Sequence, residues 1–135
     1  RERHRRARRE QTLGRLARRL EELTGLADRD RSLAAFEVFA AGLARRMTLG
    51  EAEDFAAQLP ADLRRAVLAR AHGPDRHVTL RSIEDELCAR LDVSPDRADA
   101  LMPALGAALA ELVSPGELAD MLAQLPAPMR DLLRH

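Results

Sequence analysis

The sequence has few aromatic residues, a single cysteine and no lysine. Aromatics make up 2% of the 135 residues, as three Phe without Trp or Tyr, which argues against the stacking platforms that read single-stranded nucleic acid. One cysteine excludes an intrachain disulfide framework and a multi-cysteine zinc site, and it is typical of the reducing cytoplasm. No apolar run approaches the length of a membrane span. We therefore expect a cytoplasmic protein without a membrane-spanning segment.

Arginine is concentrated at the start of the chain. The formal net charge is zero, with 22 basic and 22 acidic residues. Residues 1–20 carry nine Arg and two Glu, a net charge of +7, whereas the other 115 residues carry 13 Arg and 20 acids, a net charge of −7. This contrast makes the early arginines the candidate contacts for a partner. They are Arg1, Arg3, Arg5, Arg6, Arg8, Arg9, Arg15, Arg18 and Arg19.

The chain contains an internal repeat. Residues 48–60 match residues 114–126 at a constant offset of 66, and both segments share the pattern Gly-Glu-x-x-Asp-x-x-x-Gln-Leu-Pro. Upstream matches continue at offset 66 and then at offset 67, with the change near Leu26 and Val93. The chain is therefore two copies of one unit. The motif residues are Gly50, Glu51, Asp54, Gln58 and Pro60 in the first copy and Gly116, Glu117, Asp120, Gln124 and Pro126 in the second.

Apolar residues at helical spacing predict an all-α fold, a bundle of about eight helices in two pseudo-symmetric four-helix repeats. We expect an Arg-rich extension over residues 1–11, a first repeat over 12–71, a linker over 72–78 and a second repeat over 79–135, with the repeats packed as one domain. The predicted core residues are Leu16, Leu20, Phe36, Phe39, Leu43, Phe55, Leu59, Leu63, Ile83, Leu87, Met102, Leu105, Leu109, Met121, Leu125 and Met129.

Capping and breaking residues predict the helix ends. The first copy should have a helix ending near residue 23 before Gly25, a second over about 30–47, a third from Thr48 to near Gln58, and a fourth over about 61–71. In the second copy, Thr79 and Ser94 should cap helices, and Pro103 should kink the helix that contains it. Thr48 with Glu51 and Ser114 with Glu117 fit the capping-box pattern.

The doubled motif resembles the signature of the bacterial domain-of-unknown-function family 2267. The segments Leu-Thr-Gly-Leu-Ala-Asp-Arg-Asp-Arg and Leu-Asp-Val-Ser-Pro-Asp-Arg-Ala are similar to the same family. The resemblance covers about residues 12–135 and leaves the basic start outside it. It implies an all-helical fold of tandem repeats and no established activity.

Two groups of side chains are candidates for chemistry. In each motif the Glu and the Asp lie three residues apart on one helix face, where paired carboxylates could hold a metal or act as acid and base. Helix capping explains the same residues better, because the Glu suits a capping box and the pattern recurs in both copies. His72, His77 and Cys88 come closest to a metal site, but zinc needs three or four ligands in a closed geometry and no further Cys is present. A solvated linker with two incidental histidines explains them better, and Cys88 should be a buried, inert thiol. We expect no catalytic, cofactor-binding or metal-binding residues.

The sequence therefore favours a non-enzymatic helical interaction module, an adaptor or assembly subunit with a protein partner or a second copy of itself. The alternative is sequence-independent binding of nucleic acid through the Arg-rich N-terminal helix. Binding to a membrane surface is less favoured, because the first ten residues lack the apolar face that a surface-lying helix needs.

Overall fold

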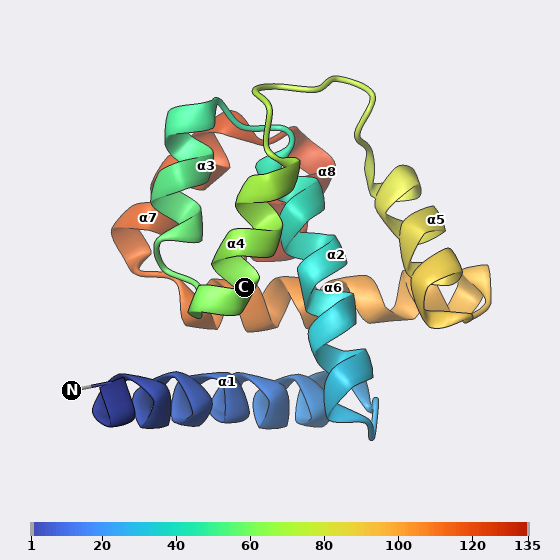
Figure 1. Cartoon of the computed structure of the whole chain (residues 1–135). Coiled ribbons are helices and arrows are strands. Elements are labelled where there is room, and N and C mark those ends of the chain that lie inside the picture. Colours follow the sequence, from blue (N-terminus) through green and yellow to red (C-terminus); the bar gives the residue numbers. More distant parts are fainter. Residues whose placement is uncertain (1, 135) are drawn as a thin grey trace.

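The structure, a computed structural model, describes the backbone of residues 2–134 and the side chains of residues 12–134. This part of the chain forms eight helices and no strand, as predicted (Figure 1). None of these helices is both long enough and apolar enough to cross a membrane. The helices are α1 (Glu2–Thr24), α2 (Arg29–Ala44), α3 (Leu49–Ala56), α4 (Ala61–Arg70), α5 (Leu80–Leu91), α6 (Pro95–Leu112), α7 (Pro115–Gln124) and α8 (Ala127–Leu133).

Most helix ends agree with the predicted capping residues. The side chains of Thr79 and Ser94 cap α5 and α6, and Gly25 follows α1 with a positive φ of 74°. Helix α2 ends at Ala44 and not near residue 47, because Met47 donates a backbone hydrogen bond three residues back, to Ala44. Helix α6 continues through Pro103, which lies on the exposed side of the helix.

All sixteen predicted core residues are buried, and they belong to one continuous apolar cluster. The three phenylalanines, Phe36, Phe39 and Phe55, are fully buried in the first copy. Methionine and leucine fill the matching positions of the second copy, where Met102, Leu105 and Met121 are also buried. The spacing of apolar residues was therefore sufficient to identify the core.

The two copies interlock, because each contributes a helix to the packing of the other. Helix α1 packs on α6 of the second copy as well as on α2 of its own copy, and α5 packs in the same way on α2 and α6. Helices α3 and α7 pack against each other (Figure 1). The two copies therefore share a single core.

The loop between the copies, which includes the predicted linker, is attached to the end of α2. The backbone N–H of Asp75 donates to the carbonyl of Arg45 at 2.8 Å, and its carboxylate accepts a hydrogen bond from Arg45 Nη2 at 3.2 Å. Arg46 Nη1 donates to the carbonyls of Asp75 and Val78. These contacts fix the path of the loop over the bundle to α5 (Figure 1).

Two helical glycines should respond in opposite ways to substitution by alanine. A Cβ at Gly106 would lie 2.5 Å from the backbone oxygen of Leu132, so α8 would have to move away from α6. We expect Gly106→Ala to lower the free energy of unfolding by about 1–3 kcal/mol. A Cβ at Gly14 would meet no atom within 4 Å. Gly14→Ala should therefore raise the free energy of unfolding by about 0.5–1 kcal/mol, because alanine favours a helix more than glycine does. Urea denaturation of both variants measures the difference, and equal effects would contradict the close packing of α6 on α8.

Candidate functional site

The two copies of the motif face each other across the pair of helices α3 and α7. The backbone N–H of Thr48, which precedes α3, donates to Gln124 Oε1 at 2.9 Å. The backbone N–H of Ser114, which precedes α7, donates to Gln58 Oε1 at 2.8 Å. Each motif glutamine thus binds the start of the other copy's helix. The two helices run antiparallel around a pseudo-twofold axis.

This exchange corrects the prediction of two capping boxes. The hydroxyl half of each box is present, because Thr48 Oγ1 accepts from the Glu51 N–H at 3.2 Å and Ser114 Oγ accepts from the Glu117 N–H at 3.2 Å. The other half is absent, since the N-cap N–H groups that the Glu side chains would bind are taken by Gln124 and Gln58. The two Glu side chains are therefore left for another role.

The freed side chains meet in an acidic cluster between α3 and α7. One carboxylate oxygen from each of Glu51, Asp54 and Glu117 lies within 4.8 Å of the other two, and we call these three residues the carboxylate cluster. Glu117 is 8% exposed, Glu51 is half-buried and Asp54 is exposed. The Oε2 atoms of Glu51 and Glu117 are buried and accept no hydrogen bond from any donor in the described part of the chain.

Burial is the main cause of an unusual titration at Glu117. It raises the pKa of Glu117 to about 8, helped by a hydrogen bond that only the protonated Glu117 can donate to Glu51 and by the negative charges of Glu51, Asp54 and Asp120. Asp120 is the second-copy counterpart of Asp54 and is exposed. Glu117 therefore keeps its proton to a higher pH than an ordinary glutamate does.

This raised pKa predicts that the folded protein loses stability as the pH rises. The pKa of Glu117 is about 8 in the folded chain, above the ordinary value of 4.5, so the folded state holds the proton more tightly than the unfolded state. The stabilisation is complete below about pH 4.5 and is lost as the pH rises through 8, by at most about 1.4 kcal/mol per pH unit. Urea denaturation between pH 5 and 9, in buffer with EDTA, measures this slope.

The neutral variant Glu117→Gln should flatten that pH dependence, because it cannot lose a proton. Glu53→Gln is the matched control, since Glu53 lies on the same helix as Glu51 and is exposed. It should keep the slope of the original protein. If the unfolding free energy of Glu117→Gln changed with pH as steeply as that of the original protein, Glu117 would not be the group that causes the pH dependence.

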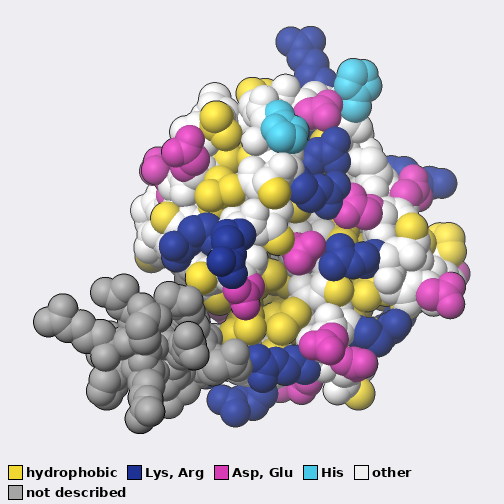
Figure 2. Space-filling view, viewed as in Figure 1, with side chains coloured by type: hydrophobic (Ala, Val, Ile, Leu, Met, Phe, Trp, Pro, Cys, Tyr) yellow, Lys and Arg dark blue, Asp and Glu magenta, His cyan; other side chains and the backbone are white. Residues whose placement is uncertain are grey.

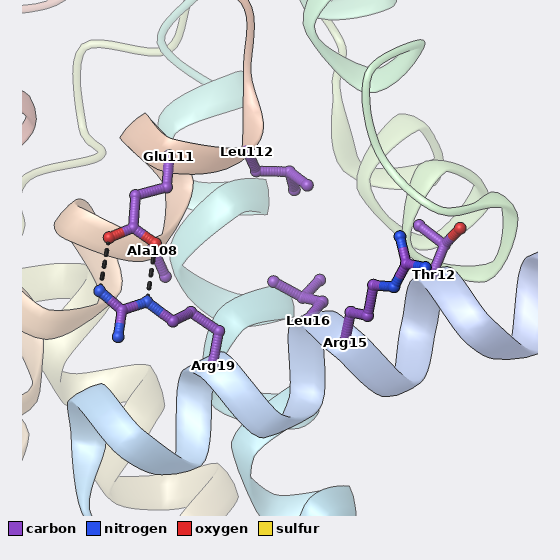
Figure 3. A pocket seen from close by; sticks show the side chains of 7 residues that line it. All are labelled: Thr12, Arg15, Leu16, Arg19, Ala108, Glu111 and Leu112. Carbon is purple, nitrogen blue, oxygen red and sulfur yellow. Dashed lines mark hydrogen bonds and ion pairs between the residues drawn. The ribbon is translucent and has the colours of Figure 1, made fainter.

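The structure describes the side chains of only three of the nine arginines predicted to contact a partner. The side chains of Arg1, Arg3, Arg5, Arg6, Arg8 and Arg9 lie outside the described residues, although the backbone of residues 2–11 is part of α1. Arg15 and Arg18 are exposed and form no ion pair with a described residue. Arg19 is bound to Glu111 of α6 by two hydrogen bonds of 2.8 and 2.7 Å (Figure 3). It also pairs with Glu22 at 3.0 Å. Arg19 therefore forms its ion pairs within the chain and holds α1 against α6.

Arg15 and Arg19 border a shallow groove between α1 and α6. Leu16, Ala108 and Leu112 line the space between them (Figure 3). The volume of the groove is about 240 Å³, below the roughly 300–1,000 Å³ that is usual for small-molecule sites. Its size suits one or two side chains of a partner.

The predicted linker histidines and the cysteine do not come together with other ligands. His72 is exposed, and His77 is fully exposed with its Nδ1 atom 3.2 Å from Asp75 Oδ1. Cys88 is half-buried and packs against the apolar core. Among the described residues, the only group of His, Cys, Asp or Glu close enough to hold a metal is the carboxylate cluster.

Of the remaining motif residues, the two prolines lie at corners of the fold, whereas Gly50 and Gly116 lie in the first turns of α3 and α7. Pro60 and Pro126 occupy the N-cap positions of α4 and α8. The repeated arginines that follow them bind these corners, because Arg64 Nη2 donates to the Leu59 carbonyl at 3.1 Å and Arg130 Nη1 donates to the Leu125 carbonyl at 3.3 Å. The prediction that these residues have structural roles agrees with these contacts. The contact between the two motifs was not predicted, because it joins residues far apart in the sequence and has no local sequence signal.

Comparison with known proteins gives a family but no activity. A family model described as "Uncharacterized conserved protein (DUF2267)" matches residues 13–132, which include both copies of the motif. No curated protein matches the chain. The family resemblance predicted from the doubled motif is confirmed.

Proposed function

The chain belongs to DUF2267, a family of uncharacterized conserved proteins, and we propose that it is a non-enzymatic adaptor or assembly module that binds through the first half of α1. The observation that carries the proposal is the division of α1 into two chemically different halves. In the second half, Leu16, Ala17, Leu20 and Thr24 are buried. Residues 2–11 include one apolar residue, Ala7, so this half of the helix offers no apolar face for packing.

The charge of the chain indicates the chemistry of the partner. An Arg-rich helix end attracts an acidic surface, and residues 21–135 carry a net charge of −7. A second copy of this chain is therefore the first partner to test. On the face shown in Figure 2, acidic side chains are scattered among arginines over the described surface. The single thiol agrees with a protein of the reducing cytoplasm.

Removal of the basic segment should abolish self-association. We expect light scattering to give a larger mass for the intact chain than for a chain that starts at Thr12, in low salt, and the difference should disappear at high salt because screening weakens charge pairing. Leu16 is the first residue of α1 that is buried among those with described side chains, and the truncated chain keeps it.

Two further variants test whether self-association depends on the positive charge of residues 1–11 or only on the presence of that segment. Replacement of Arg3, Arg5, Arg6, Arg8 and Arg9 by Gln should act like the truncation, whereas replacement by Lys keeps the charge and should preserve the assembly. Equal masses for the intact and truncated chains under all salt conditions would remove α1 from any role in self-assembly.

Nucleic-acid binding is the second candidate function. It is supported by Arg15 and Arg18, which are exposed and extend the arginine series along α1, and it is opposed by the negative charge of the rest of the chain. A gel-shift assay of DNA and RNA over a salt series tests it. Affinity should fall steeply with salt, with a slope close to the number of phosphates contacted. Binding that is unchanged by the Arg-to-Gln replacement would reject this candidate.

A further inference from the structure

We propose that the carboxylate cluster, Glu51, Asp54 and Glu117, is a binding site for one divalent cation that prefers oxygen ligands. The three residues come from both copies of the repeat, two from α3 and one from α7. A cation bound there would join the copies at their pseudo-twofold axis. The inference is independent of the partner that α1 binds.

The geometry of the cluster fits a single coordination sphere. Oxygen ligands of Ca²⁺ lie 2.3–2.6 Å from the ion, so ligands on opposite sides are about 5 Å apart. The three carboxylate oxygens lie within 4.8 Å of one another, which is close enough for one ion to contact all of them. Only carboxylates form the group, and such a ligand set favours Ca²⁺, Mg²⁺ or Mn²⁺ over metals that prefer nitrogen or sulfur.

A second observation, independent of the clustering of acids, points to a ligand. Glu117 is 92% buried (8% exposed), and its Oε2 atom accepts no hydrogen bond from a described donor. The same holds for the buried Oε2 atom of Glu51. Buried carboxylate oxygens normally have partners, since an unpaired one has lost its hydrating water without a replacement. A cation between α3 and α7 would supply that partner for both residues.

The surroundings of the cluster provide negative charge and room for water. The charges that act on Glu117 are those of Glu51, Asp54 and Asp120, all of them carboxylates. Asp54 and Asp120 are exposed, so the site has an open side through which water could complete the coordination of a cation that needs six or more ligands. A proton shared by Glu51 and Glu117 is the competing explanation for their close approach.

Calorimetric titration of the intact, EDTA-treated chain with CaCl₂, and separately with MnCl₂, tests the proposal. We expect saturable binding of one ion per chain for at least one of the two, and a melting temperature that rises with its concentration because only the folded state forms the site. Electron paramagnetic resonance gives the bound Mn²⁺ directly. No saturable binding of either ion up to about 10 mM, well beyond the weak end of protein calcium sites, would overturn the proposal in favour of the shared proton.

Three variants assign the site. Glu117→Gln and Asp54→Asn should each weaken the binding by about tenfold or more, because each removes one ligand charge. Asp54 is exposed, so its replacement tests the site without disturbing the core. Glu53→Gln, an equal change of charge on the same helix, should bind as the original protein does. Equal affinity in all four proteins would overturn the proposal, since the ion would then be bound elsewhere.

Discussion

The fold depends on burial of apolar helix faces between the two copies of the repeat. Helix α1 needs α6, and α5 needs α2, to cover residues such as Leu20 and Leu87, which are fully buried. Each copy alone would leave these faces in water, because its own helices cover only part of them. Several polar contacts also join the two copies. Arg70 donates two hydrogen bonds to Glu86, and Arg97 donates one to the carbonyl of Thr24. The pseudo-twofold arrangement thus results from shared burial.

The motif is best understood as the polar counterpart of this interlock. Gln58 and Gln124 each satisfy an N–H group at the start of the opposite copy's helix, a role that a Glu within the same copy could have filled. The exchange joins α3 to α7 and moves Glu51 and Glu117 toward the axis. A contact that serves helix capping therefore also brings other carboxylates close to the buried Glu117, and this burial and charge raise the pKa of Glu117.

The long helix α1 combines two chemical environments in one element. Its second half belongs to the core through Leu16 and Leu20 and to the surface of α6 through the pair of Arg19 with Glu111. That pair also raises the pKa of Arg19 and lowers the pKa of Glu111, as hydrogen bonding between opposite charges requires. The first half has arginine in place of an apolar stripe. The described contacts of α1 with the core come from its second half.

The helices, the repeat, the core and the family could all be predicted from the order of the residues. Apolar spacing and capping residues act within a few turns of one helix, so Leu16, Phe36 or Ser94 could be assigned from their neighbours alone. The contact of Glu51 with Glu117 and the bond from the start of α7 to Gln58 could be found only in the tertiary structure. The two contacts join residues 66 and 56 positions apart, and they form because α3 docks against α7. The burial that gives Glu117 its unusual chemistry exists only after that docking.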